Sequence, residues 1–137
     1  MQFRSWVNSN RQFSVSGYQA DFDGEHGYSG ILYGEGFRDI LCNRGMVSVI
    51  GSDSKPMYIG RFAEDAVLKK EIKVEDWNAY EVTAKGFTFI NKINGHIMSI
   101  CSDEDKANRK ESGILAIQVH QGPPMTVEVK NIRIKKL

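Results

Sequence analysis

The clearest structural signal in the chain is the segment Thr88-Phe89-Ile90-Asn91-Lys92-Ile93-Asn94-Gly95-His96-Ile97-Met98-Ser99-Ile100-Cys101. Two runs of β-prone residues with period-two patterning flank its Asn94-Gly95 dipeptide, as expected of two half-buried strands. Asn-Gly between such runs is the strongest short-range hairpin signal, because a type I′ turn needs positive φ at both central positions. We therefore predict a tight β-hairpin centred on Asn94-Gly95.

Period-two patterning continues through most of the chain and predicts a β-rich protein. Further strands are expected near residues 13–22, 29–33, 46–50 and 80–84. Gly17 is expected to mark a bulge that switches the phase of the first of these strands. Residues 61–73 have near-helical apolar spacing and predict one short helix, whereas 103–111 is polar throughout and predicts a loop.

The C-terminal stretch 113–137 predicts a second hairpin, with Gly122-Pro123-Pro124 as a rigid corner, because proline has no amide donor for a ladder. Side chains alternate along a strand, so one parity is expected in the core and the other in a wet groove. Leu115, Ile117 and Val119 are expected to point into the core. Gln118 and His120 are expected to point into the groove. The second strand is expected to repeat the alternation with Val127, Val129, Ile132 and Ile134.

Composition limits the class of protein. The chain has 137 residues, 41% hydrophobic and 26% charged, which indicates one soluble domain over 1–137. A formal charge of +1 gives no field for nucleic acid or an anionic membrane. No run approaches the ~20 apolar residues of a membrane span, and the first residues lack the apolar stretch of a secretion signal. Cys42 and Cys101 are expected to be buried free thiols, because they fit neither a disulfide framework nor a zinc spacing.

Several segments, in order, resemble the 3-keto-disaccharide hydrolase domain family. They are Phe3-Arg4-Ser5, Val15 to Asp21, Tyr28 to Arg38, Asp76 to Val82, Ile93-Asn94-Gly95, Gly113 to Met125 and Val127 to Leu137. The resemblance covers nearly the whole chain. It implies an all-β fold, a concanavalin-like jelly-roll β-sandwich of two antiparallel sheets with the sugar site on the concave side.

The sequence departs from the family pattern in two places. Family members usually have several strands ahead of the Phe3-Arg4-Ser5 position, so we expect an N-terminally truncated sandwich. A sheet without its neighbours exposes unpaired amides and an apolar face, which favours a homo-oligomer through the exposed sheet edge or a rearranged sandwich. Gly34 stands where the related motif commonly has an aspartate, so any role of that carboxylate is absent.

His120 and Gln118 lead the candidate site residues, because the matching motif and the strand alternation place both toward the groove. Histidine titrates near neutrality and passes protons, so His120 is a catalytic candidate. Glutamine donates to and accepts from sugar hydroxyls, so Gln118 is a substrate-binding candidate. A structural histidine bonded at the rim of the sandwich stays open as the alternative.

Acidic and amide side chains form the second group of candidates. Asp21 and Glu35 offer the carboxylate pair that acid-base catalysis or a divalent cation requires. Gln19 shares the parity of Asp21 and is a substrate-binding candidate. Ordinary turn and salt-bridge roles for the carboxylates stay open.

Arginines and tyrosines complete the set. Arg38 is a catalytic candidate and Arg4 a substrate-binding one, because a guanidinium holds a sugar hydroxyl, a keto oxygen or an acid. Tyr18 and Tyr33 are substrate-binding candidates, because an aromatic face stacks on a pyranose ring. Simple charge pairing and core packing are the alternatives, and Tyr18 shares the parity of Phe22, which favours the core.

The resemblance implies cleavage of the glycosidic bond of a 3-keto-glycoside, by hydrolysis or by elimination. A 3-keto group acidifies the C2 proton, so a base removes it and the aglycone leaves from the enolate. His120 or a carboxylate of Asp21 and Glu35 is the expected base, with Arg38 or a divalent metal ion stabilising the enolate. Two alternatives remain, a non-catalytic carbohydrate-binding module and a structural, self-associating β domain. Kinship alone predicts a periplasmic or extracellular location.

Overall fold

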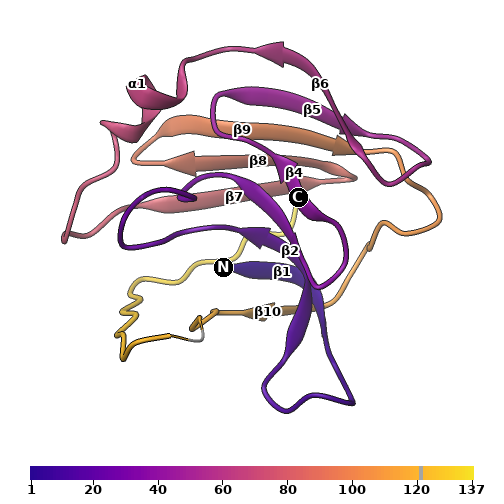
Figure 1. Cartoon of the computed structure of the whole chain (residues 1–137), viewed down its shortest axis with the longest axis horizontal. Coiled ribbons are helices and arrows are strands. Elements are labelled where there is room, and N and C mark those ends of the chain that lie inside the picture. The colour runs from indigo at the N-terminus through magenta and orange to yellow at the C-terminus, as the bar shows by residue number, and fades with distance from the viewer. Residues whose placement is uncertain (121) are drawn as a thin grey trace.

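The computed structural model describes residues 1–120 and 122–137, and they form two five-stranded sheets (Figure 1). The first sheet has the order β10-β1-β2-β3-β4. Its strands are β1 (Gln2–Val7), β2 (Val15–Ala20), β3 (Leu32–Glu35), β4 (Asp39–Cys42) and β10 (Ile114–Ala116). The second sheet has the order β6-β5-β9-β8-β7. Its strands are β5 (Met46–Ile50), β6 (Pro56–Arg61), β7 (Tyr80–Lys85), β8 (Thr88–Ile93) and β9 (His96–Asp103). The predicted β-sandwich is confirmed.

The core lies between the two sheets. Phe3 and Tyr18 from the first sheet pack with Phe89 from the second, and the Tyr18 and Phe89 ring centroids are 4.5 Å apart. Buried side chains of both sheets complete this cluster: Ala20, Leu32, Leu41, Cys42, Ile50 and Cys101. Because β2 sends Tyr18 and Ala20 into the core, the alternate residue of that strand faces outward.

The Asn94-Gly95 hairpin is confirmed. It joins β8 to β9, and both turn residues have positive φ, 52° at Asn94 and 84° at Gly95. The predicted helix is α1 (Asp65–Lys69), whose Leu68 is buried against Ile93 and Met98. Both cysteines are free and buried, as expected. Within the described residues, no helix has the length and apolar character needed to cross a bilayer.

One strand pair departs from the expected antiparallel arrangement. β5 and β9 run parallel, with Val47 opposite Ile100 and Ile50 opposite Asp103. Parallel neighbours need a long crossover, and here the chain passes through β6, α1, β7 and β8 between the two strands.

The expected bulge lies on β1 and not at Gly17. Phe3 pairs with Tyr18 and Trp6 with Ser16, so three steps along β1 match two along β2. Arg4 takes up the extra residue with φ of 48°. Gly17 lies where a Cβ atom would collide with Ser5, so glycine there lets the bulged strand approach.

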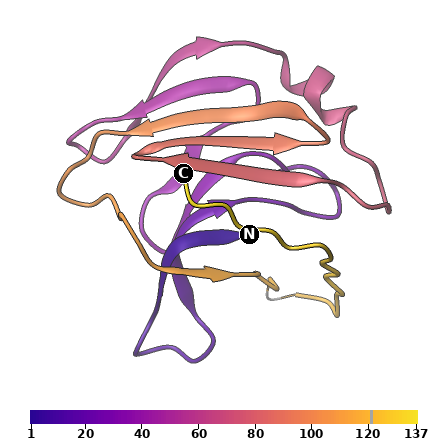
Figure 2. The same cartoon turned by 180° about the vertical axis from the view of Figure 1, so that it is seen from behind.

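The predicted C-terminal hairpin is wrong in the described residues. β10 pairs with β1 only over Ile114–Ala116, and residues 117–120 and 122–137 belong to no strand. Ala116 lies opposite Gln2, the first residue of β1, so the chain beyond Ala116 passes the end of its ladder partner. The apolar side chains expected in the core are instead exposed: Leu115, Ile117, Val119, Val129, Ile132 and Ile134. Segment 126–137, the yellow end of the ribbon, runs past the side of the sandwich between β1 and β7 (Figure 2).

Candidate functional site

Polar side chains gather on the outer face of the first sheet. Gln19 of β2 lies opposite Tyr33 of β3, and Gly17 lies opposite Glu35, so Tyr33 and Glu35 share the face of Gln19. We call this set the polar face: Gln19, Asp21, Tyr33, Glu35 and Gln118. Strands β2 and β3 present most of it, and Gln118 reaches it from the chain that follows β10.

Two glutamines connect the two carboxylates of the polar face. Gln19 Nε2 donates to Asp21 Oδ1 at 3.1 Å and to Gln118 Oε1 at 2.8 Å. Gln118 Nε2 donates in turn to Glu35 Oε2 at 3.2 Å. Gln19 Oε1 is buried and has no hydrogen-bond partner among the described residues. The polar face therefore has two carboxylates and two amides, and the amide oxygen of Gln19 is an acceptor without a partner among the described residues.

The electrostatic environment of the polar face is acidic. Burial raises the pKa of the Asp21 carboxyl, and the hydrogen bond from Gln19 only partly opposes this. The pKa of Tyr33 is raised by burial, and also by its 3.1 Å hydrogen bond to Asp39 and by the nearby charges of Glu35 and Asp21. No lysine or arginine in the described chain forms an ion pair with these carboxylates. A carboxyl with a raised pKa is a stronger base once ionised, which suits proton abstraction.

His120 is exposed and makes no hydrogen bond within the described chain. His120 follows Gln118 by two residues in the sequence, but it does not take part in the hydrogen-bond network of the polar face. The ladder that would fix its orientation ends at Ala116.

Arg38 and Tyr18 lie away from the polar face, in a buried charged cluster at one end of the core. Arg38 Nη1 donates to Asp103 Oδ1 at 3.1 Å, and its Nη2 donates to Asp103 Oδ2 and, at 3.1 Å, to the Tyr18 hydroxyl. The Tyr18 hydroxyl also donates to Asp103, and the Arg38 side chain is only 3% exposed. This arrangement neutralises Asp103 and leaves Arg38 no access to a sugar on the opposite face.

Arg4 is also separate from the carboxylates. Its guanidinium donates to the carbonyl oxygens of Gly86 at 2.7 Å and Lys110 at 3.3 Å, and lies over the rings of Phe87 and Phe89. Its positive φ at the β1 bulge turns the side chain toward the second sheet. Arg4 thus ties the two sheets together.

A divalent metal site does not emerge from the described residues. Among them, no three or more His, Cys, Asp or Glu side chains lie close enough together to hold an ion. The described residues therefore do not fit a metal ion.

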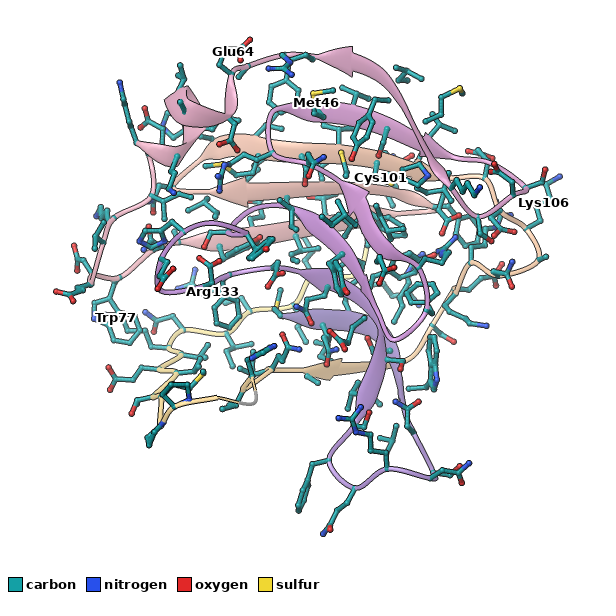
Figure 3. The ribbon with its side chains drawn as sticks, in the orientation of Figure 1. Met46, Glu64, Trp77, Cys101, Lys106 and Arg133 are labelled. Atoms are coloured by element: carbon teal, nitrogen blue, oxygen red, sulfur yellow. The ribbon has the colours of Figure 1, made fainter. Side chains whose placement is uncertain are left out.

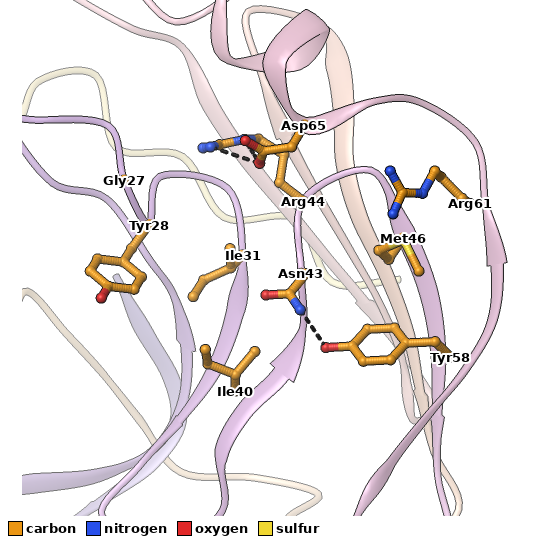
Figure 4. A pocket seen from close by; sticks show the side chains of 10 residues that line it. All are labelled: Gly27, Tyr28, Ile31, Ile40, Asn43, Arg44, Met46, Tyr58, Arg61 and Asp65. Carbon is orange, nitrogen blue, oxygen red and sulfur yellow. Dashed lines mark hydrogen bonds and ion pairs between the residues drawn. The ribbon is translucent and has the colours of Figure 1, made fainter.

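A hollow of about 340 Å³, which we call the edge hollow, is lined by residues that include Ile40, Asn43 and Tyr58 (Figure 4). Ile40 lines it and lies opposite Tyr33 in the β3–β4 ladder. Asn43 donates to the Tyr58 hydroxyl at 2.7 Å across the hollow, and Arg44 pairs with Asp65 at 2.9 Å. Sequence reasoning missed Tyr58, because the strand that carries it, β6, lacks clean period-two patterning and is exposed along most of its length.

Comparison with known proteins gives one family. Residues 1–135 match the family described as "3-keto-alpha-glucoside-1,2-lyase-like domain". No curated protein and no solved structure gives a significant match. The match spans nearly the whole chain and confirms the resemblance found in the motifs.

Proposed function

The chain belongs to the family of 3-keto-alpha-glucoside-1,2-lyase-like domains, and on that premise we propose that its polar face binds and cleaves a 3-keto-glycoside. Family membership by itself supports a carbohydrate-related function. The observation that carries the finer proposal is the network in which Gln19 and Gln118 connect Asp21 to Glu35.

The polar face has the chemistry that recognises a sugar. Carboxylates accept hydrogen bonds from hydroxyl groups, and carboxamides both donate and accept. Gln19 Oε1 is an acceptor without a partner in the described chain, and a buried polar group without a partner lowers stability until a ligand satisfies it. The edge hollow beside Ile40 gives room for the second residue of a disaccharide.

Asp21 is the proposed general base. It removes the C2 proton, which the neighbouring ketone acidifies, and the electron pair of the C2–H bond forms the enolate. As the enolate re-forms the C3 ketone, its electron pair forms a C1=C2 double bond and the C1–O bond breaks. The aglycone oxygen leaves with the C1–O electron pair and takes a proton from solvent. Asp21 returns its proton to solvent, so the proton count balances. One N–H of the Gln118 amide donates to Glu35, which orients the amide, and its other N–H is the neutral donor for the developing negative charge.

Turnover of p-nitrophenyl 3-keto-α-glucoside by Asp21→Asn tests this proposal. Asparagine keeps the acceptor for Gln19 but does not accept a proton, so we expect a loss of about 100-fold in rate, within the range for a general base. Asp53→Asn is the matched control, because Asp53 is exposed and only caps a turn through Lys55 N at 3.1 Å. Equal turnover by the two variants would rule out the proposed role. Binding without any product from the unmodified chain would instead favour a lectin-like module.

We also propose that the chain self-associates through its C-terminal segment. Val129, Ile132 and Ile134 are 49%, 70% and 76% exposed. β10 is the edge of its sheet, and a short edge strand with free backbone groups accepts a further strand. Antiparallel pairing with a second copy would cover the same segment in both chains, as two-fold symmetry allows.

A further inference from the structure

A second hollow is lined by residues from the loops near the C-terminal end of β9. This end of β9 lies at the opposite end of the sandwich from α1 (Figure 1). It has a volume of about 310 Å³, at the lower end of the roughly 300–1,000 Å³ of small-molecule sites. We call it the end hollow, and its lining residues are Trp6, Phe37, Arg38, Ser54, Asn108 and Lys110. We propose that the end hollow binds a carboxylate-bearing monosaccharide, a hexuronate, independently of the polar face.

The wall of the end hollow is aromatic and fixed. The Trp6 and Phe37 rings meet edge to face with centroids 5.5 Å apart, and Phe37 also packs against Tyr18 in the core. The guanidinium of Arg38 stacks over Phe37 at 4.5 Å. Such a wall offers an apolar surface to the C–H face of a pyranose ring.

Among the described residues, the end hollow has one unpaired positive charge, that of Lys110. Its lining includes Arg38 and Lys110 and no carboxylate, but Arg38 is already paired with the buried Asp103 and Asp105. Lys110 Nζ lies 5.4 Å from the Trp6 ring and forms no ion pair in the described chain, while its backbone is held by the Tyr18 hydroxyl and by Arg4. Arg38 Nε is buried and has no acceptor among the described residues. The unpaired Lys110 ammonium beside the unfilled Arg38 Nε donor favours an anionic ligand.

Neutral groups in the end hollow favour a ligand with hydroxyls. Asn108 Nδ2 donates to Ser54 Oγ at 3.1 Å and to Asp105 Oδ2 at 2.9 Å, which fixes the amide and leaves its Oδ1 without a donor in the described residues. A hydroxyl group of the ligand fits that acceptor. One carboxylate, several hydroxyls and an apolar ring face together describe a hexuronate.

Glucuronate is the probe. Glucose, which lacks the carboxylate, and acetate, which lacks the sugar ring, are the controls. The chain has two tryptophans, so Trp77→Phe makes Trp6 the sole fluorescent reporter. In that protein we expect glucuronate to change the Trp6 emission with an affinity at least tenfold above that of glucose or acetate. Equal affinities for the three compounds, or no change with glucuronate, would overturn the proposal.

A matched pair of charge variants locates the binding. Lys110→Gln is expected to lower the glucuronate affinity about tenfold, as for loss of one charge-assisted hydrogen bond. Lys106→Gln makes the same charge change on the same loop, at its outer tip (Figure 3), and is expected to have no effect. Equal losses from both variants would show general charge attraction and overturn the site. Glu35→Gln, on the polar face, is expected to leave glucuronate binding intact, so the two proposals fail separately.

Discussion

Gln118 Nε2 donates a hydrogen bond to Glu35 Oε2 at 3.2 Å, although the two residues are 83 positions apart in the chain. Gln118 also accepts from Gln19 Nε2 at 2.8 Å. One amide thus joins the chain after β10 to β2 and β3 and connects the carboxylates of the polar face. Glu35 is positioned by the β2–β3 ladder, so its hydrogen bond orients the Gln118 amide.

Replacing Gln118 by alanine is expected to weaken sugar binding about tenfold, since one lost hydrogen bond to a charged group accounts for that factor. Thermal stability should change little, because Gln118 is only partly buried. Isothermal titration with a 3-keto-glucoside measures the affinity. Gln12→Ala is the control, because Gln12 is exposed in the loop before β2. Equal affinities for the two variants would disprove the role of Gln118.

Asp21→Asn is expected to stabilise the fold at neutral pH. Burial raises the pKa of Asp21 in the folded state, so its ionisation above that pKa lowers the free energy of unfolding. As the pH falls through the folded pKa, Asp21 takes up its proton and this destabilisation disappears. The melting temperatures of the variant and the unmodified chain should therefore converge at acid pH. A variant that melts lower at pH 7 would contradict the assigned environment.

Arg38→Ala is expected to lower the free energy of unfolding by about 3–5 kcal/mol, because it leaves the buried Asp103 charge without its partner. Arg61→Ala removes an exposed pair with Glu64, whose atoms are 2.6 Å apart, and should change stability by about 1 kcal/mol or less. Urea unfolding of both variants gives the comparison. A similarly small change in the free energy of unfolding for both variants would mean that the buried Arg38–Asp103 pair does not stabilise the fold.

The thiols of Cys42 and Cys101 should resist alkylation in the folded protein. Burial raises the pKa of both, to about 12 for Cys101, so little reactive thiolate forms at neutral pH. Iodoacetamide labelling followed by mass spectrometry should show modification only when denaturant opens the core. Rapid labelling of both thiols in native buffer would be inconsistent with the packing.

Ile132→Lys is expected to shift the chain toward monomer by placing a charge in the self-associating segment. Light scattering across a concentration series measures the mass. Val74→Lys is the control, because Val74 is another exposed apolar residue outside that segment. A chain that is monomeric at all concentrations would contradict self-association.

Sequence patterns were sufficient to predict those features that are formed by residues close together in the chain. The β8–β9 hairpin follows from Asn94-Gly95 and its flanking alternation, because a type I′ turn is determined by its two central residues. Asp21 and Glu35 share a face because β2 and β3 are neighbours and each strand has period two. Those features need no information from distant parts of the chain.

Long-range pairing could not be predicted in the same way. Stretch 103–111 is polar and does form a loop after β9, but Asp103 and Asp105 are buried because Arg38 and Ser54 approach from other elements. The alternation of apolar and polar side chains in residues 114–134 suits a strand. A strand also needs a neighbouring strand for its backbone hydrogen bonds, and β10 is paired with β1 only as far as Ala116.

The most direct test is a crystal structure of the chain soaked with a 3-keto-glucoside. We predict sugar density on the outer face of the first sheet, in contact with Gln19, Asp21 and Gln118, with the keto ring held there and the aglycone toward Ile40. A sugar bound only in the end hollow, or an outer face that stays free of ligand at saturating sugar, would contradict the account.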